Sequence, residues 1–206
     1  MEPVARLLGE LRRAIADERV LDAIRAVPRD AFVPRELRSR AYENVALPIG
    51  EEQTISQPLV VARMTELLQL QPGDRVLDVG TGSGYHAAVL AQLAQHVWSI
   101  ERLGRLSQHA AASLRRAGVE NVTLIVGDGS RGLPDEAPFD AINVAAAAWP
   151  EIPPALERQL APGGRLVAPV GASGQQLVLV ERSEEGELTH TTLDPVRFVP
   201  LIEGEP

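Results

Sequence analysis

Residues 75–85 read RVLDVGTGSGY, an apolar run that leads directly into a glycine-rich turn. Residues 85–94 then have the apolar spacing of a helix. A strand, a glycine turn and a helix in this order are typical of a nucleotide-like ligand site at the carboxyl edge of a parallel sheet. The dinucleotide fingerprint needs a further glycine at position 85, where this chain has Tyr85. The turn therefore favours a nucleoside that carries no diphosphate.

Carboxylates accompany three successive strands of the predicted sheet. Asp78 lies within the first strand, Glu101 ends the second, and Asp128 follows the third within Gly127-Asp128-Gly129. We expect Glu101 to bind ribose hydroxyls and Asp128 to lie near an adenine amino group. Asp78 and the turn at residues 80–84 would face a cationic methionine part, which negative charge stabilises. The pattern predicts S-adenosyl-L-methionine as the cofactor, although each element alone also fits an ordinary turn or strand end.

Strands and helices alternate through the middle of the chain. We predict an α/β fold with a doubly wound, mostly parallel sheet, N-terminal helices and an antiparallel C-terminal hairpin. The expected helices cover residues 4–27 in two pieces with Asp17 as an N-cap, and then 58–70, 85–94, 102–117 and 152–160. The expected strands are 75–79, 97–101, 122–126, 139–145 and 164–170, followed by the hairpin 176–182 and 188–193. Residues 28–56 look irregular.

The chain has no linker-like segment, so we expect one domain over residues 1–206. Residues 1–57 would form N-terminal helices and a substrate loop, and residues 58–206 a Rossmann-like core. The net charge of −8 argues against a nucleic-acid partner, because phosphate contacts need a basic surface. No signal peptide or membrane-length apolar run is present, which predicts a cytoplasmic protein without membrane contact. The histidines have no metal-ligand spacing, and we expect no metal.

A second candidate site precedes the sheet, in the segment Gln53-Thr54-Ile55-Ser56-Gln57-Pro58. Two hydroxyl side chains, Thr54 and Ser56, lie just before a predicted helix. Ser56 fits an ordinary N-cap. A helix N-terminus with hydroxyls and free N–H groups also suits a carboxylate ligand. Spacing alone leaves both interpretations open.

At this point the chain resembles the protein-L-isoaspartate O-methyltransferase family, which repairs damaged aspartyl and asparaginyl sites. The most specific match is the segment 53–58, whereas the glycine motif is shared with many methyltransferases. The resemblance extends from about Pro28 to the C-terminus. The matching segments are residues 46–50, 53–58, 76–85, 127–129, 137–142, 150–153, 162–167 and 198–201.

The resemblance implies a Rossmann-like S-adenosylmethionine-dependent methyltransferase fold. It implies methyl transfer to the α-carboxyl group of L-isoaspartyl residues in damaged proteins and peptides, by a protein expected to be a monomer. Ser56 and Thr54 match catalytic positions, and Val199, Pro200 and Leu201 match a segment near the peptide substrate. The residues implied to bind the cofactor are Ile55, Asp78, Gly80, Thr81, Gly82, Gly84, Glu101, Arg102, Asp128 and Gly129.

The chain departs from the family pattern at two places that bear on the shape of the pocket. Residues 144–150 read VAAAAWP, which is one residue longer than usual around Trp149 and has Ala145 where relatives have threonine. Ser130 replaces a bulkier residue. Two alternatives therefore stay open: a methyltransferase that acts on another carboxylate or a small molecule, and a non-catalytic S-adenosylmethionine-binding protein. A nicotinamide-dependent oxidoreductase fits less well, because the third glycine is absent.

Overall fold

A seven-stranded sheet forms the centre of the computed structural model, which describes residues 3–204. The strand order is β5-β4-β3-β6-β7-β8-β9, with parallel pairing from β5 to β7 and antiparallel pairing through β8 and β9. The fold class predicted from the sequence is confirmed. The strands are β3 (Arg75–Val79), β4 (His96–Glu101), β5 (Val122–Val126), β6 (Phe139–Val144), β7 (Leu160–Val170), β8 (Gln176–Arg182) and β9 (Leu188–Pro195).

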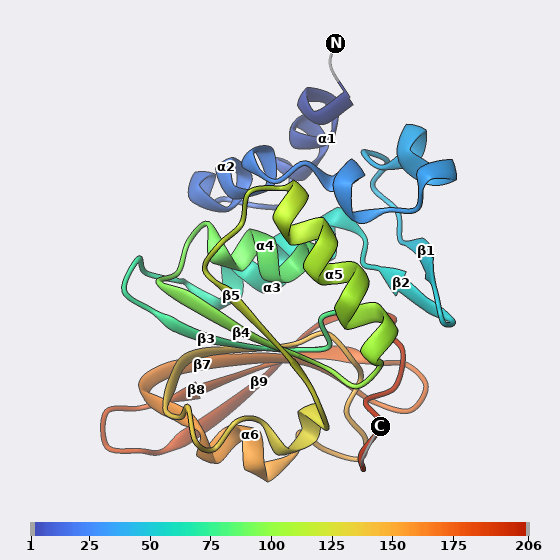
Figure 1. Cartoon of the computed structure of the whole chain (residues 1–206). Coiled ribbons are helices and arrows are strands. Elements are labelled where there is room, and N and C mark those ends of the chain that lie inside the picture. Colours follow the sequence, from blue (N-terminus) through green and yellow to red (C-terminus); the bar gives the residue numbers. More distant parts are fainter. Residues whose placement is uncertain (1–2, 205–206) are drawn as a thin grey trace.

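Helices cover both faces of this sheet. Three of them, α3, α4 and α5, lie on one face, and α6 lies on the other (Figure 1). The two apolar layers are separate: Val76 and Val97 contribute to one, and Leu77 and Ile142 to the other. This alternation along the strands is the period of two that a sheet buried on both faces requires. The helices are α3 (Pro58–Leu68), α4 (Tyr85–Ala91), α5 (Gly104–Arg116) and α6 (Pro154–Arg158).

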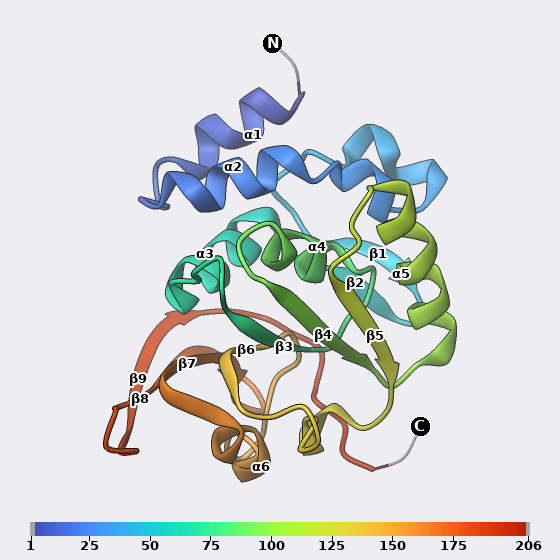
Figure 2. The same ribbon diagram turned by 60° about the vertical axis from the view of Figure 1, so that its left-hand side comes forward.

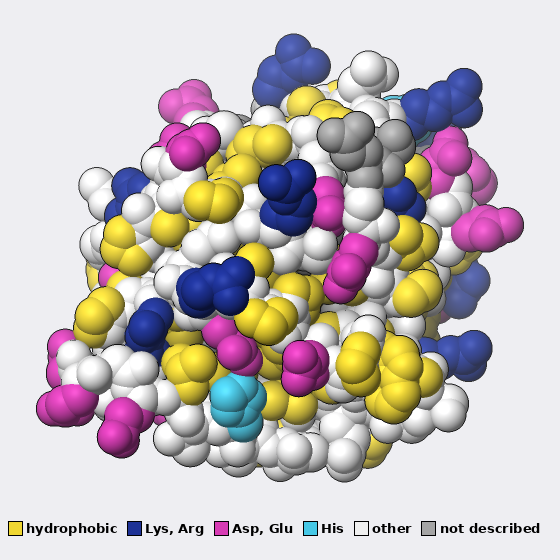
Figure 3. Space-filling model, turned by 90° about the horizontal axis from the view of Figure 1, so that it is seen from below, with side chains coloured by type: hydrophobic (Ala, Val, Ile, Leu, Met, Phe, Trp, Pro, Cys, Tyr) yellow, Lys and Arg dark blue, Asp and Glu magenta, His cyan; other side chains and the backbone are white. Residues whose placement is uncertain are grey.

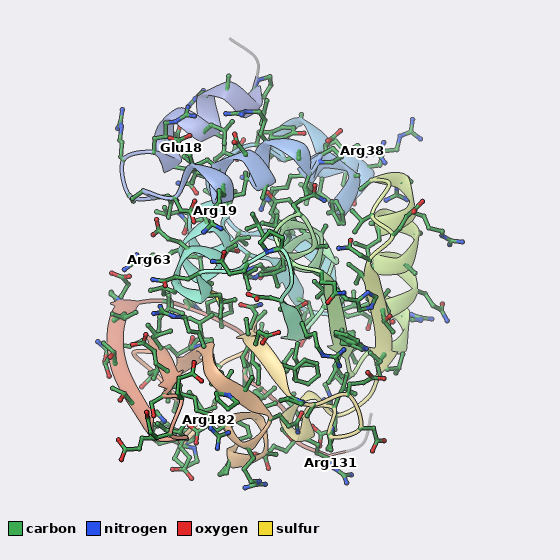
Figure 4. The ribbon with its side chains drawn as sticks, turned by 90° about the vertical axis from the view of Figure 1, so that its left-hand side faces the viewer. Glu18, Arg19, Arg38, Arg63, Arg131 and Arg182 are labelled. Atoms are coloured by element: carbon green, nitrogen blue, oxygen red, sulfur yellow. The ribbon has the colours of Figure 1, made fainter. Side chains whose placement is uncertain are left out.

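Two N-terminal helices, α1 (Pro3–Leu11) and α2 (Glu18–Ala26), form a further layer over α3 and α4 (Figure 2). Asp17 is the N-cap of α2, as predicted, and accepts a hydrogen bond from the Arg19 N–H. Polar contacts join this layer to α3. Glu66 accepts from the Asp17 N–H at 3.0 Å. Arg19, which is labelled in Figure 4, donates from its guanidinium to the Leu70 carbonyl just after α3 at 3.0 Å. The N-terminal layer thereby fixes the orientation of α3, which begins next to residues 54–56.

The expectation of irregular structure over residues 28–56 was wrong. This segment contains two 3-10 helices, η1 (Arg29–Phe32) and η2 (Arg35–Arg40), and an antiparallel pair of strands, β1 (Leu47–Gly50) and β2 (Gln53–Ile55). The elements are too short to give a periodic pattern. Glu51 and Glu52 form the turn between the strands with φ of 50° and 58°, a left-handed conformation that glutamate rarely adopts. The sequence has no glycine at position 51 or 52 from which this turn could have been predicted.

Element boundaries differ from prediction mainly around prolines and glycines. The helix predicted over residues 152–160 is only α6 (Pro154–Arg158), since Pro153 and Pro154 disfavour the helical conformation of the residue before each of them. The helix predicted over 85–94 ends at Ala91. The strand predicted from residue 164 begins instead at Leu160, which pairs with Phe139 across an irregularity in the register. Gly163 lies within this strand.

Candidate active site

A cleft opens at the carboxyl ends of β3, β4 and β6, where the parallel strands meet one edge of the sheet. Such an edge is the usual ligand site of a doubly wound fold. Segments far apart in the sequence form its walls: the turn after β3, the end of β2, and the C-terminal segment. The lining residues include Thr54, Ile55, Ser56, Gly80, Thr81, Gly82, Tyr85, His86, Glu101, Arg102, Gly129, Ala145, Val199, Pro200 and Leu201.

Glu101 joins the glycine turn to the end of β4. Its Oε2 accepts from the Gly82 N–H at 2.8 Å, and its Oε1 accepts from the Leu103 N–H at 3.0 Å. The residue is 7% exposed and lines the cleft. Each carboxylate oxygen has a second lone pair. The two backbone contacts therefore orient the carboxylate and still leave acceptor capacity for two ligand hydroxyls.

The three glycines of the turn have different surroundings. Gly80 and Gly82 line the cleft with φ of 95° and 53°, a region that side chains disfavour. Gly84 lies outside the cleft lining and precedes α4, where a Cβ would come within 3.2 Å of the Ala110 side chain. Gly84 therefore allows α4 to approach α5 closely, whereas the sequence placed it among the cofactor contacts.

Asp78 does not line the cleft, contrary to expectation. The register places it beside Ser99 on β4 and Asn143 on β6, and both side chains donate to its carboxylate, at 2.6 and 2.7 Å. Asp78 is 1% exposed. Its pKa is raised to about 6, chiefly by burial and to a smaller extent by the negative charge of Glu101, against the opposing effect of these hydrogen bonds. Asp78 thus supports the turn from beneath instead of facing a ligand.

The hydrogen bonds around Asp78 continue to residues that the sequence analysis missed. Asn143 donates to His86 Nδ1 at 3.2 Å, and His86 Nε2 lies 3.1 Å from the Thr65 hydroxyl of α3. Burial lowers the pKa of His86 to about 3, so the imidazole is neutral. The Thr81 hydroxyl is 2.6 Å from the Ser99 hydroxyl. The members come from three strands, two helices and the glycine turn, so only the folded chain brings them together.

Asp128 also lies outside the cleft lining, although Gly129 belongs to it. Its Oδ1 accepts from the Ser130 N–H and hydroxyl, and its Oδ2 accepts from the Gly204 N–H at 2.9 Å. Desolvation acts to raise the pKa of Asp128, but these hydrogen bonds prevail and lower it. Through the bond to Gly204, the Asp128 carboxylate holds the C-terminal segment in place. This segment lies beside the end of β5 (Figure 2).

The second group of predicted residues lines the cleft from the end of β2. Thr54 is exposed, Ser56 is half-buried, and Ile55 between them is 2% exposed in the core. Ser56 is not the N-cap of α3. Gln57 takes that position, without a side-chain capping bond. The Ser56 hydroxyl therefore remains at the cleft instead of serving the helix.

The expectation of free N–H groups at the start of α3 was wrong. Pro58 has no N–H, and the Leu59 N–H donates to the Asn44 side chain at 3.0 Å. The N–H groups of Val60 and Val61 both donate to the Gln57 carbonyl. An anion beside Ser56 would thus meet hydroxyl donors and not the amides of this helix.

The C-terminal segment pairs with the loop after β6. The Ala147 N–H donates to the Val199 carbonyl at 2.7 Å, and the Leu201 N–H donates to the Ala147 carbonyl at 2.8 Å. Val199 and Leu201 are half-buried against the cleft, and Pro200 is exposed. Trp149, in the longer part of this loop, is 65% exposed. The extra residue therefore projects outward instead of filling the cleft.

Neither a metal cluster nor a membrane span is found within residues 3–204. No three His, Asp or Glu side chains there converge as metal ligands. No helix in the same range is long and apolar enough to cross a membrane.

Comparisons with known proteins agree with this geometry. A sequence model described as Protein-L-isoaspartate(D-aspartate) O-methyltransferase matches residues 4–206. A protein-L-isoaspartate O-methyltransferase of Serratia proteamaculans is 54% identical over 200 residues, which cover 97% of this chain and 95% of the relative. One from Roseiflexus castenholzii is 55% identical over 194 residues, covering 94% and 88%.

Two solved structures with the same description share the fold. One is 30% identical with a TM-score of 0.86, and the match covers 96% of this chain and 65% of that longer chain. The other, from Plasmodium falciparum in complex with S-adenosyl-L-homocysteine, is 26% identical with a TM-score of 0.82 and covers 97% and 98%.

Proposed function

Since this chain belongs to the protein-L-isoaspartate(D-aspartate) O-methyltransferase family, we propose that the two walls of its cleft bind the two reactants of that activity. The chain is an enzyme that transfers a methyl group from S-adenosyl-L-methionine to the α-carboxyl group of L-isoaspartyl residues in proteins and peptides. The assignment of individual residues is our proposal. The contacts of Glu101 carry it, because they aim one carboxylate along the glycine turn.

The wall formed by the glycine turn and Glu101, which we call the cofactor wall, fits S-adenosyl-L-methionine. Glu101 would accept hydrogen bonds from the ribose hydroxyls, and Gly80, Thr81 and Gly82 would lie along the nucleoside and methionine part. A carboxylate is the acceptor that a vicinal diol needs, and the turn leaves its backbone accessible. Arg102 and Gly129 complete this wall. When bound, the cofactor supplies an electrophilic methyl group on a cationic sulfur.

The acceptor needs little chemical activation. A carboxylic acid has an ordinary pKa of about 4, so the isoaspartyl α-carboxyl group is already ionised at neutral pH. No general base is required. The remaining tasks are to align the carboxylate with the methyl group and to exclude water from the reacting atoms.

Thr54 and Ser56, together with the C-terminal residues 199–201, form the wall that we call the acceptor wall. Thr54 and Ser56 would align the substrate carboxylate as catalytic residues. Their hydroxyls donate to the substrate carboxylate without a full opposite charge, so the nucleophile is oriented but not overstabilised in the ground state. With the N–H groups of α3 already engaged, these hydroxyls are the donors that the end of β2 supplies. Ile55 packs behind them, and Val199, Pro200 and Leu201 would contact the peptide.

The substitution Ser56→Ala tests this assignment. We expect kcat/KM for an isoaspartyl peptide to fall about tenfold or more, since a hydrogen bond to a charged group contributes about 1.5–3 kcal/mol. The Kd for S-adenosylhomocysteine, measured by calorimetry, should stay within about twofold. The aspartyl twin of the peptide should stay unmethylated. A matched control, Ser39→Ala, alters an exposed serine of η2 and should change neither value.

Two results would contradict the assignment. An unchanged kcat/KM would remove Ser56 from the reaction. A loss confined to cofactor affinity would move it to the other wall. Equal methylation of the isoaspartyl peptide and its aspartyl twin would favour a methyltransferase with another acceptor. Binding of S-adenosylhomocysteine without any methyl transfer would favour a non-catalytic binding protein.

We also propose that residues 1–206 act as one domain and as a cytoplasmic monomer. Its partners are isoaspartyl proteins and peptides, with neither nucleic acid nor membrane among them. The net charge of −8 supports this choice of partner, as does the face in Figure 3, where arginine and acidic side chains are interspersed. Sedimentation analysis that gave a dimer at micromolar concentration would contradict the monomer.

A further inference from the structure

Arg29 is a fully buried cation next to the acceptor wall. It begins η1 and is 0% exposed. No ion pair with a carboxylate is found for it in the chain from residue 3 to 204. Burial lowers its pKa, and two nearby tyrosines oppose that shift only in part. A buried charge without an anionic partner is costly, and apolar replacements of buried charges are often more stable.

The guanidinium of Arg29 instead binds three backbone carbonyls from separate segments. Nη1 donates to the Ala41 carbonyl after η2. Nη2 donates to the Val45 carbonyl at 3.2 Å and to the Ser56 carbonyl at 2.9 Å. A planar fork can span these acceptors at once, which an ammonium cannot do in the same geometry. Arg29 thus fixes the backbone of Ser56 relative to the segment before β1.

The same side chain reaches the cofactor wall. Its guanidinium carbon lies 5.5 Å from the centroid of the Tyr85 ring, within the range of a cation–π contact. Tyr85 directly follows the glycine turn, is 1% exposed and lines the cleft. Phe32 of η1 holds the ring from another side at 5.7 Å between centroids. One buried cation therefore contacts a residue on each wall.

Within residues 3–204, Arg29 is the side chain found to hydrogen-bond the backbone of Ser56. Ser56 lies beyond the end of β2 and is not the helix cap. Its carbonyl is held by Arg29, while the start of α3 is held by Asn44 through Leu59. Since a misplacement of about 1 Å can cost about 100-fold in rate, the Ser56 hydroxyl needs such an anchor.

We infer that Arg29 is a positioning residue, which holds the Ser56 backbone so that its hydroxyl meets the substrate carboxylate beside the methyl group. This inference rests on the role proposed for Ser56. It gives the costly buried cation a role: the hydrogen bond to the Ser56 carbonyl and the contact with the Tyr85 ring connect the two walls. Arg29 itself does not touch either reactant.

A double-mutant cycle tests the inference, with Arg29→Lys and Ser56→Ala alone and combined. Lysine keeps the charge and the aliphatic stem but cannot bridge the three carbonyls. We expect Arg29→Lys to lower kcat/KM for an isoaspartyl peptide about tenfold, with the Kd for S-adenosylhomocysteine within about twofold. In the Ser56→Ala background the same substitution should lower it less than about threefold, because coupled residues are not additive.

The outcomes separate the two proposals. An additive cycle, with about tenfold loss in both backgrounds, would overturn the positioning role and leave the role of Ser56 intact. A Ser56→Ala variant without kinetic effect would overturn both. If the Kd for S-adenosylhomocysteine rose by the same factor by which kcat/KM fell, Arg29 would stabilise the cleft as a whole and would not position Ser56 specifically. The control Arg25→Lys, on an exposed arginine of α2, should leave all values unchanged.

A second variant and a second measurement guard against failure to fold. Arg29→Gln is neutral and smaller, and saturating S-adenosylhomocysteine stabilises the folded form of either variant. Hydrogen exchange at residues 53–57, followed by mass spectrometry in the presence of this ligand, should be faster in whichever variant folds. An unchanged rate of hydrogen exchange at residues 53–57 in a folded variant would contradict the proposal that Arg29 anchors the Ser56 backbone.

Discussion

The two walls of the cleft are built in different ways. The cofactor wall consists of one sheet edge, where Glu101 contacts the turn after the neighbouring strand. The acceptor wall is assembled from the end of β2, a buried arginine on η1 and the C-terminal segment. Contacts on the first wall follow from strand register. Contacts on the second depend on how segments more than a hundred residues apart pack together.

This difference teaches where each wall is sensitive. The cofactor wall has a carboxylate that two backbone N–H groups orient, so its loss should affect cofactor affinity directly. The acceptor wall has hydroxyls on a segment that a single cation anchors, so its loss should affect turnover. The following expectations test this separation.

The largest effect is expected for Glu101→Gln. The amide would turn an NH2 group toward one of the two N–H donors, Gly82 or Leu103, and would lose the charge that binds hydroxyls. We expect the Kd for S-adenosylhomocysteine to rise about 100-fold, equivalent to about 3 kcal/mol. Calorimetry measures this change, with the exposed Glu136→Gln as control. An unchanged Kd for S-adenosylhomocysteine together with a raised KM for the peptide would reverse the assignment of the two walls.

A smaller effect is expected for Gly129→Ala, which tests how tightly the cofactor wall is packed. A Cβ at Gly129 would lie 2.5 Å from Val79 Cγ1, so the Val79 side chain or the backbone on one side of the contact must shift. We expect the free energy of unfolding to fall by about 2 kcal/mol, as for other overpacked sites. Gly127→Ala is a matched control two residues away, where the nearest atom would be 4.0 Å distant. Equal urea midpoints for the two variants would contradict this packing.

The smallest effect is expected for the pH dependence of Asp78, whose raised pKa of about 6 exceeds the ordinary 3.8. The folded state therefore binds a proton more readily than the unfolded state between these values. The free energy of unfolding should fall as pH rises through this window, by about 2 kcal/mol between about pH 4 and 7 relative to Asp78→Asn, and stay lower above it. Urea titrations of both proteins at about pH 4, 5, 6 and 7 measure the difference. A difference that grew with pH would mean that the network favours the ionised form.

The sequence predicted the cofactor wall more completely than the acceptor wall. The alternation of strands and helices, the glycine turn and Glu101 are local features of the sequence, and the structure places Glu101, Gly80 and Gly82 along one cleft. Gly84 and Asp78 belong to the same sequence motif but lie outside the cleft lining: Gly84 allows α4 to pack closely on α5, and Asp78 supports the turn from beneath. The motif alone does not say which of its members face the ligand.

On the acceptor wall, resemblance to the family selected residues 54–56, while their surroundings were predicted poorly. The free helix amides were expected and are engaged. Arg29 gave no signal in the sequence, because an arginine near a proline is ordinarily solvated. Its three carbonyl partners lie 12, 16 and 27 residues away, so no local pattern reports them.

By itself the sequence determined the α/β alternation, the class of cofactor and the family, since these depend on local periodicity and short motifs. Tertiary structure decided which carboxylate faces the cleft, where the C-terminal segment lies, and what holds Ser56. The physical reason is that hydrogen bonds to backbone carbonyls need only a C=O in the right place. Every residue has that group, and only the folded chain determines where it lies.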